Sequence, residues 1–228
     1  MYEQVVKEIA AMVLKKKTDS SPLCIGIDGI DAAGKTYLAD KLAAFLQENG
    51  QSVNRASIDG FHNPRQIRHR RGSYSPEGYY FDSFDYELLI KYLLDPLTPE
   101  GDRVYRIRAF DFKTETPILG GEIKAANDDI LIFEGVFLFR REIERYWDLK
   151  IFVDIDFQTC LERVLKRDLY LFGNEEEILK RYQERYIPGQ ELYFKLENPK
   201  EKADIVIDNN DFTKPFIANI NKDSENHR

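Results

Sequence analysis

The chain has 228 residues and carries 33 basic and 40 acidic side chains, which give a net charge of −7. This negative balance argues against general affinity for nucleic acid, which depends on basic surface to displace counterions from phosphates. No apolar run approaches the ~20 residues of a membrane-spanning helix. Residues 1–20 are interrupted by charges and lack a cleavage site, so a secretion signal is also disfavoured.

Cys24 lies in a strand-like run and Cys160 in a helical one, and neither has a CxxC partner. A disulfide framework and a zinc site are therefore both disfavoured. A reducing, cytoplasmic location is expected.

Strand-length apolar runs alternate with helical patterns along the chain. Residues 1–20 repeat apolar positions at helical spacing and predict an amphipathic helix. The elements expected after it are, in chain order, a strand at 23–28, a helix at 35–48, a strand at 53–58, a long functional loop at 60–83, a short helix at 86–94, extended segments at 104–109 and 116–123, strands at 130–133 and 149–153, helices at 157–171 and 175–196, and a strand at 203–207. Strands separated by helices favour βαβ units and a parallel sheet covered on both faces. No linker or repeat interrupts this order, so residues 1–228 are expected to form a single domain.

A glycine-bearing turn follows the first predicted strand. The segment GIDAAGKT, from Gly29 to Thr36, matches G-x-x-x-x-G-K-[ST] at each fixed position. In this pattern the backbone N–H groups cradle phosphates, Lys35 adds a positive charge near the β- and γ-phosphates, and the Thr36 hydroxyl binds Mg²⁺. A strand before the turn and a helix after it are the context that the pattern requires, so a phosphate site is favoured over a turn without a ligand. The predicted nucleotide-binding residues are Gly29, Ile30, Asp31, Ala32, Ala33, Gly34, Lys35, Thr36 and Tyr37.

Two acidic residues follow predicted strands directly. Asp59 comes after 53–58, and Glu134 comes after 130–133. Ligands of open α/β sheets bind beyond the carboxyl ends of the strands, so both side chains are expected near the phosphate turn. With Thr36 they are the predicted metal ligands, Glu134 foremost, and Asp59 is also placed to accept a proton from a substrate hydroxyl. The alternative is that these acids only cap loops or following helices.

Together these residues resemble the uridine kinase, phosphoribulokinase and bacterial pantothenate kinase superfamily of P-loop kinases, most closely its uridine-kinase-like branch. The resemblance runs from Ile25 to Asn209. Its motifs are GIDGIDAAGKT at 26–36, DGFH at 59–62, FDSFD at 81–85, FDF at 110–112, FEG at 133–135 and ADIVI at 203–207. It implies a three-layer α/β P-loop kinase fold, in which a five-stranded parallel sheet has helices on both faces. It also implies a small lid at about 160–190 and an acceptor-binding excursion at about 60–125.

The resemblance further implies transfer of the γ-phosphate of ATP, with Mg²⁺, to a hydroxyl of a small metabolite. A uridine- or cytidine-like nucleoside is the leading acceptor. The alternatives are another anionic or sugar-like acceptor, or an ATPase or switch that acts on a protein partner. The expected partners are ATP and the acceptor, without nucleic acid or membrane, and a homo-oligomer is left open.

By resemblance, Asp59 is the general base, Asp82 hydrogen-bonds sugar hydroxyls, and the helix with Arg163, Lys166 and Arg167 forms one leg of the lid. Lys35, Asp59 and Arg167 are thus the predicted catalytic residues, and Arg163 is assigned to the nucleotide. Arg163 and Arg167 share a helical face, and their alternative is an exposed pair that bridges Glu162 or Asp168.

The chain departs from the uridine-kinase pattern at two places. Lys113, Thr114 and Glu115 stand where that pattern has a pyrimidine-contacting histidine, and 171–174 lacks its lid arginines.

A basic cluster follows Asp59: Arg65, Arg68, His69, Arg70 and Arg71. Its guanidinium groups either bind an anionic group at the site or form a solvated loop whose charges pair with Asp82, Asp85 or Glu87. His62 either binds substrate or is a hydrogen-bonded turn residue. The predicted substrate-binding residues are His62, Arg65, Arg68, Phe81, Asp82, Phe110 and Phe112.

Overall fold

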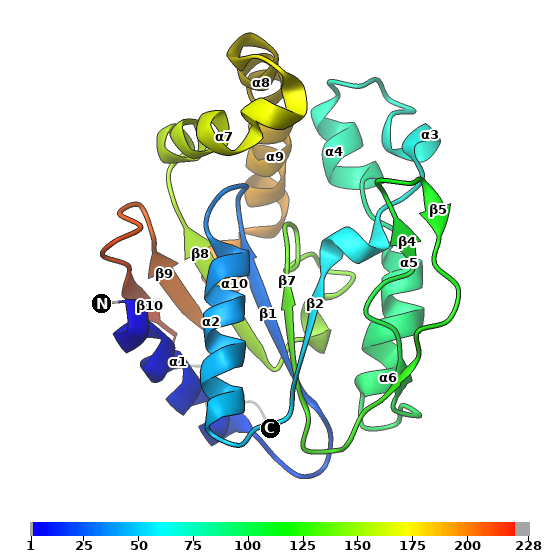
Figure 1. Ribbon diagram of the computed structural model, residues 1–228, viewed down its shortest axis with the longest axis vertical. Coiled ribbons are helices and arrows are strands. Elements are labelled where there is room, and N and C mark those ends of the chain that lie inside the picture. Colours follow the sequence, from blue (N-terminus) through cyan, green and yellow to red (C-terminus); the bar gives the residue numbers. More distant parts are fainter. Residues whose placement is uncertain (1, 222–228) are drawn as a thin grey trace.

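The computed structural model describes residues 2–221, apart from the side chains of residues 170–172, and has three layers, with helices on both faces of a central sheet (Figure 1). The strands of the sheet are β1 (Leu23–Gly29), β2 (Val53–Ser57), β7 (Ile130–Glu134), β8 (Leu149–Asp154), β9 (Ile205–Asp208) and β10 (Phe216–Ile220). Their order is β10-β9-β8-β1-β7-β2, and only the β10–β9 pair is antiparallel. The predicted five-stranded parallel sheet is confirmed. The sequence did not predict β10, a five-residue edge strand whose side chains are mostly exposed.

Burial on both faces explains why the central strands read as continuous apolar runs. All seven residues of β1 are buried, and β1 pairs with β7 on one side and β8 on the other. Alternate strand residues enter two separate cores. Ile25 and Ile27 pack with the N-terminal helices, whereas Cys24 packs with residues of the excursion between β2 and β7. This arrangement places the carboxyl end of β1 in the middle of the sheet.

The first core is covered by α1 (Tyr2–Lys16), α2 (Lys35–Glu48), α7 (Phe157–Phe172) and α8 (Glu175–Arg181). The predicted helix at 175–196 is continuous but changes pitch: α8 leads through a π-helical turn, η4 (Tyr182–Tyr186), into α9 (Ile187–Glu197), and α10 (Pro199–Lys202) follows. The end of α7, with α8 and η4, lies at the top of Figure 1, within the segment predicted as a lid, and is called the lid region below. No helix within residues 2–221 has both the length and the apolar character needed to cross a bilayer.

The excursion between β2 and β7 is more ordered than predicted. The segment expected as a loop at 60–83 contains η1 (Ile58–Phe61), α3 (Arg65–Arg68) and α4 (Pro76–Asp82). The prediction of a loop was wrong here, because α4 packs closely against α9. At Gly189 of α9 the two helices are so close that an added Cβ would lie 2.8 Å from Cδ1 of Tyr79 in α4.

The next helical stretch runs through α5 (Tyr86–Leu89), η2 (Ile90–Leu94) and α6 (Asp95–Leu97). It passes Pro96 rather than ending before it, because proline is tolerated in the first turn of a helix. The extended segments form two short antiparallel pairs, β3 (Val104–Tyr105) with β6 (Ile123–Lys124) and β4 (Phe110–Asp111) with β5 (Thr116–Pro117).

Candidate active site

Close contacts and backbone conformation both require glycine in the turn between β1 and α2. The φ angles of Gly29, Ala32 and Gly34 are positive, at 152°, 56° and 96°. A Cβ on Gly29 would lie 2.4 Å from the carbonyl oxygen of Val153, and one on Gly34 would lie 2.6 Å from Nδ2 of Asn209. A larger side chain at either glycine would therefore distort the turn.

The main-chain N–H groups of this turn are open to an anion. Within residues 2–221, no protein group accepts a hydrogen bond from the N–H of Ala32, Gly34 or Lys35, whereas Ala33 N–H donates locally, to the carbonyl of Ile30 over 3.3 Å. Because α2 begins at Lys35, its positive N-terminal end points at the same place. The turn thus has the features of a phosphate site.

Lys35 folds back over the turn. Its Nζ donates to the carbonyl oxygen of Ile30 over 2.7 Å, and the residue is only 8% exposed. The ammonium group is held beside the open N–H groups through a bond to a neutral acceptor. A phosphate oxygen can replace that acceptor with a stronger, charge-assisted bond.

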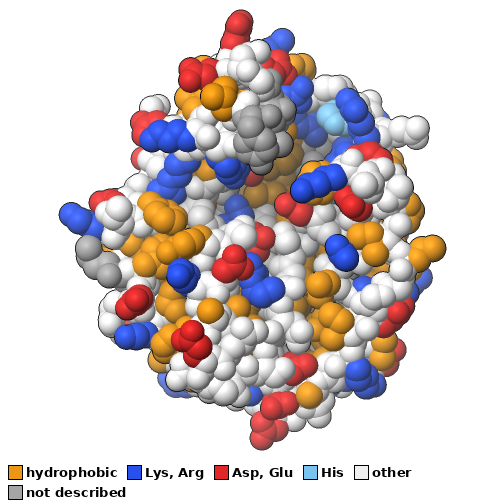
Figure 2. Space-filling view, in the orientation of Figure 1, with side chains coloured by type: hydrophobic (Ala, Val, Ile, Leu, Met, Phe, Trp, Pro, Cys, Tyr) orange, Lys and Arg blue, Asp and Glu red, His pale blue; other side chains and the backbone are white. Residues whose placement is uncertain are grey.

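Asp59 lies in η1, directly after β2. Although 63% of its side-chain surface is accessible, the protein around it limits hydration, and this desolvation is the main reason why the pKa of Asp59 is raised. The charge of Asp31 raises this pKa further, whereas Lys35 and Arg167 lower it. These groups therefore act on one another across one cleft. Figure 2 shows the surface hollowed between the lid region and the excursion, with acidic and basic side chains at the rim.

Glu134 ends β7 opposite Ile27 of β1 and is 8% exposed. Within the described chain, no hydrogen bond or ion pair reaches its carboxylate. A buried carboxylate without a donor is costly unless a cation neutralises it. Mg²⁺ binds one or two protein oxygens and keeps waters and substrate phosphates as its other ligands, so Glu134 and the Thr36 hydroxyl fit this ion. No cluster of at least three His, Cys, Asp or Glu side chains suited to a metal occurs among residues 2–221.

Arg167 projects from α7 beside this cleft. Its Nε and Nη2 donate to the two carboxylate oxygens of Asp168 over 2.6 and 2.9 Å, and Nη2 also reaches the hydroxyl of Tyr182. The ion pair with Asp168, which was the alternative interpretation of Arg167, is therefore present. It does not bury the arginine, because 53% of the Arg167 side chain stays exposed while Asp168 is buried. Asp168 thus orients the guanidinium group and leaves it accessible.

Arg163 contacts the phosphate turn through backbone atoms. Its Nη1 donates to the carbonyl of Ala32 over 3.1 Å, and its Nη2 donates to that of Asn209 over 2.6 Å. Asn209 itself donates from Nδ2 to Ala33 over 2.6 Å. The sequence interpretation missed this asparagine, although its place directly after β9 is a signal of the same kind that identified Asp59. The ring of Tyr37 packs against Phe212, 5.0 Å away between centroids, so only its main chain can serve the turn.

Asp31 connects the phosphate turn to two distant helices. Gln190 of α9 donates to its Oδ2 over 2.8 Å, and Tyr79 of α4 donates to the same atom over 3.2 Å. Both partners were missed, because no local pattern marks a residue that bonds 159 positions away. The turn, the excursion and the helix after the lid therefore meet at one carboxylate.

Asp28, directly before the turn, is fully buried. Its Oδ1 accepts from Gly29 N–H over 2.7 Å, and its Oδ2 accepts from Leu138 N–H over 3.2 Å and from the Tyr193 hydroxyl. Burial raises the pKa of Asp28 to about 6, although the bond from Tyr193 and that from Gly29 act in the opposite direction. Asp28 holds the end of β1 to the segment after β7, a role that the sequence did not predict.

The predicted acceptor side gathers aromatic residues around His62. Its ring lies between Phe84 and Phe112, with centroids 4.6 and 4.7 Å away, and its Nδ1 is 3.0 Å from the carbonyl oxygen of Asp59. Burial is the main reason why the pKa of His62 falls to about 4, so the ring is neutral at pH 7. Phe112 remains partly exposed, whereas Phe110 is buried and contributes to packing.

Asp82 is not free to receive a sugar hydroxyl in this structure. Its side chain is completely buried, and its two oxygens accept hydrogen bonds from Arg70 and from Nε of Arg71, the latter over 2.8 Å. Desolvation raises the pKa of Asp82, but these two arginines outweigh it and the net shift is downward. The alternative interpretation of the basic cluster, pairing with Asp82, thus holds for Arg70 and Arg71. The exposed ring of Phe81 lies 5.8 Å from the Arg71 guanidinium group.

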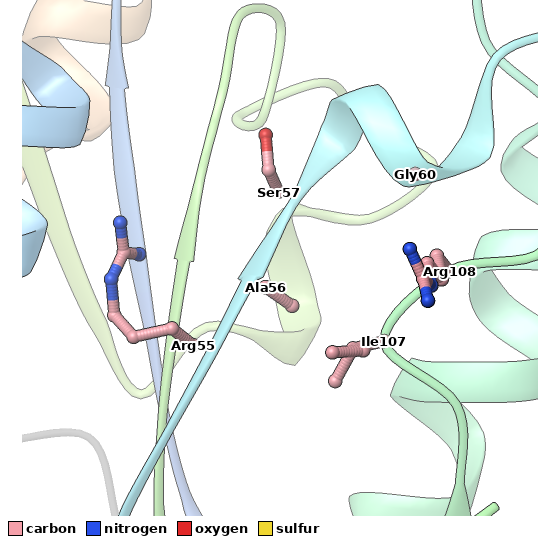
Figure 3. A pocket seen from close by; sticks show the side chains of 6 residues that line it. All are labelled: Arg55, Ala56, Ser57, Gly60, Ile107 and Arg108. Carbon is pink, nitrogen blue, oxygen red and sulfur yellow. The ribbon is translucent and has the colours of Figure 1, made fainter. Parts of the chain in front are cut away.

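A separate cavity of about 290 Å³ opens at the outer edge of β2 (Figure 3). It is lined by Arg55, Ala56, Ser57, Gly60, Ile107 and Arg108. The side chains of Ala56 and Ile107 face each other across it, whereas that of Arg55 points away, to Asp40. The cavity borders η1 from outside and is not the cleft that contains Lys35.

The sequence model described as "Phosphoribulokinase / Uridine kinase family" matches residues 24–213. Uridine-cytidine kinase A of Dictyostelium discoideum is 32% identical over 192 residues, which cover 82% of this chain and 36% of that protein. Uridine kinase of Saccharomyces cerevisiae is 28% identical over 192 residues, 82% of this chain and 37% of that protein. The chain therefore spans well under half the length of these two relatives. A solved structure described as a possible uridine kinase, from Bacillus stearothermophilus, is 25% identical with a TM-score of 0.71, and the match covers 90% of this chain and 97% of that one.

Proposed function

The chain belongs to the phosphoribulokinase/uridine kinase family, and we propose that it is an ATP-dependent phosphotransferase whose acceptor is a hydroxyl of a small, nucleoside-like metabolite. One observation carries the proposal: an open anion-binding turn with Lys35 shares its cleft with the raised-pKa carboxylate of Asp59. The two relatives named as uridine or uridine-cytidine kinases support uridine or cytidine as the first acceptors to test.

Each residue has a distinct part in this proposal. The N–H groups of the turn and the Lys35 ammonium bind the phosphates of ATP and stabilise the charge of the transferring group. Asp59 accepts the proton of the acceptor hydroxyl as its oxygen attacks the γ-phosphorus in line. Its raised pKa makes it a stronger base than an ordinary aspartate. Mg²⁺ held by Thr36 and Glu134 would supply further charge neutralisation to the phosphates.

Arg167 adds a further positive charge for the transferring phosphate in this proposal. Its guanidinium group is oriented by buried Asp168 and remains accessible above the cleft. In phosphoryl-transfer enzymes an arginine so placed stabilises the transition state and contributes about 10³–10⁵ in rate. We assign Arg167 this role, and we assign Arg163 to holding the turn through Ala32.

Acceptor-dependent release of ADP tests the proposal. The protein is incubated with ATP and Mg²⁺, with and without uridine or cytidine, and the phosphorylated product is identified by mass spectrometry. Lys35→Ala should abolish transfer. Lys41→Ala, which removes an exposed lysine on the same helix, should leave it unchanged. If ADP release never depends on an acceptor, the alternative of an ATPase or switch is favoured instead.

A further inference from the structure

A carboxylate of the protein itself lies beside a cluster of basic residues next to the proposed acceptor site; we call this cluster, Arg65, Arg68 and His69, the basic pocket. Glu115, in the turn between β4 and β5, accepts a hydrogen bond from the main-chain N–H of Arg65 at its Oε2 over 2.8 Å. Its Oε1 accepts one from Nη2 of Arg68. Two donors, one of them cationic, therefore bind the two oxygens of a single carboxylate.

The basic groups of this pocket exceed what Glu115 can neutralise. The Arg65 side chain is exposed, and within residues 2–221 no partner contacts its guanidinium group. Nε of Arg68 and Nδ1 of His69 are buried without a hydrogen-bond partner. Since buried polar atoms normally find a partner, these two nitrogen atoms mark a place where one is missing, and Nε–H of Arg68 requires an acceptor.

Helices near the lid add further positive charge. Desolvation and then the charges of Arg185, Arg68, Arg65 and Arg181 lower the pKa of His69, so four guanidinium groups act electrostatically on this ring. Arg181 is paired with Glu177, and Arg185 donates to the carbonyl groups of residues 68, 72, 73 and 75. Arg185 thus fixes the loop that carries Arg68 and His69, which gives the pocket a defined shape.

The pocket is one side chain away from the proposed base. Arg68 and Glu115 both act electrostatically on the ring of His62, and His62 Nδ1 lies 3.0 Å from the carbonyl oxygen of Asp59. An acceptor whose hydroxyl reaches Asp59 could therefore extend past His62 to Arg68. Phe112, from the same β4–β5 hairpin as Glu115, packs against that ring.

Glu115 is held in a way that permits its release. Its φ is 56°, a left-handed conformation that is uncommon for residues other than glycine, and 35% of its side-chain surface is exposed. For an L-residue this backbone conformation costs free energy relative to an ordinary turn. Because Glu115 keeps part of its surface in solvent, a substrate anion can reach Arg68 and compete with Glu115 for its guanidinium group.

We propose that the pocket of Arg65, Arg68 and His69 binds an anionic group of the acceptor, a carboxylate or a phosphate, and that Glu115 occupies the pocket when the acceptor is absent. This inference rests on the proposed function, because it defines the acceptor of the same site. It narrows the substrate class from a neutral hydroxyl compound to one that carries a negative charge at its far end.

Matched acceptors with a free 5′-hydroxyl test this inference. Uridine is compared with orotidine, which adds a carboxylate, and with 3′-UMP, which adds a phosphate. At least one anionic acceptor should have a higher kcat/KM than uridine. Arg68→Gln should lower that value by roughly tenfold or more and lower the value for uridine by a smaller factor. Glu115→Gln should lower KM for the anionic acceptor, because it removes the competing charge.

The ion pair of Arg106 with Glu122 is a matched control, since it lies in the same excursion and has similar exposure. Arg106→Gln and Glu122→Gln should leave the preference for the anionic acceptor unchanged. Titration calorimetry with uridine, orotidine and 3′-UMP, in the presence of a non-hydrolysable ATP analogue, measures binding without turnover.

The outcomes separate the two proposals. If uridine is phosphorylated at least as well as both anionic acceptors and Arg68→Gln has no selective effect, the anion pocket is wrong and the kinase proposal stands. A higher KM for anionic acceptors in Glu115→Gln also contradicts the pocket, because Glu115 would then be structural. If no acceptor is phosphorylated but an anionic one binds in an Arg68-dependent manner, the pocket stands and the kinase proposal fails. If none binds, the pocket is overturned as well.

Discussion

Nε2 of Gln190 lies 2.8 Å from Oδ2 of Asp31, so the helix that follows the lid is bonded directly to the phosphate turn. Tyr79 of the excursion bonds the same oxygen atom. These two bonds therefore link the excursion and the helix after the lid region to the conformation of the phosphate turn.

Gln190→Met should weaken ATP binding. The substitution keeps the volume of a side chain that is 1% exposed but removes a bond to Asp31. A single hydrogen bond to a charged group contributes about 1.5–3 kcal/mol, so Kd for ATP should rise about tenfold. Gln183→Met, at an exposed position of η4, is the control and should bind ATP normally. Equal affinity in all three proteins, measured by calorimetry, would contradict the coupling.

Gly34→Ala should destabilise the protein and abolish nucleotide binding. Gly34 has a φ of 96°, and a Cβ there would lie 2.6 Å from Nδ2 of Asn209. Gly50→Ala is a matched control, since its φ is 79° but no atom lies within 4 Å of the added Cβ. The control should lose about 1 kcal/mol of unfolding free energy, and Gly34→Ala should lose more. Denaturant unfolding with and without ATP measures both effects, and a difference smaller than the error would rule out the clash.

Asp28 should make the folded protein less stable as pH rises from about 4 to about 6. Its folded pKa is about 6 against an ordinary value of 3.8. In that interval the unfolded chain has already released the proton that the folded chain retains. Each pKa unit corresponds to about 1.4 kcal/mol of unfolding free energy. Asp28→Asn should remove this dependence, which denaturant unfolding at several pH values can detect. An unchanged slope would show that Asp28 has an ordinary pKa.

His62 should have the opposite effect in nearly the same interval. Its folded pKa is about 4 against 6.5, so between these values the unfolded chain binds a proton that the folded chain does not. The stability that the neutral His62 ring contributes to the folded protein is lost as pH falls from 6.5 towards 4. In His62→Gln, the unfolding free energy should therefore fall as pH rises through this interval, because the effect of Asp28 remains. In Asp28→Asn it should rise with pH, because the effect of His62 remains. Parallel curves for the two variants would contradict both assignments.

The sequence predicted those parts of the site that depend on local pattern. The phosphate turn, Asp59 and Glu134 follow buried strands, and a strand covered on both faces is recognisable as an apolar run. The hydrogen-bond partners of Asp31 could not be predicted from the sequence, because Tyr79 and Gln190 are 48 and 159 positions away along the chain. The pairing of Arg70 and Arg71 with Asp82 depends on how the excursion folds, so two interpretations remained until the structure showed α4. β10 was not predicted because it is a short strand at the edge of the sheet whose side chains do not alternate between buried and exposed.

The most direct test of the account is the rate of acceptor phosphorylation in Asp59→Asn, measured at saturating ATP and acceptor alongside Kd for ATP. Asp128→Asn, an exposed carboxylate before β7 at the opposite end of the sheet, is the control. Loss of a general base should reduce kcat of Asp59→Asn by about 10²–10⁴-fold while Kd for ATP and the fold are preserved. A kcat close to that of the unmodified protein would show that the carboxylate facing the phosphate turn is not the base.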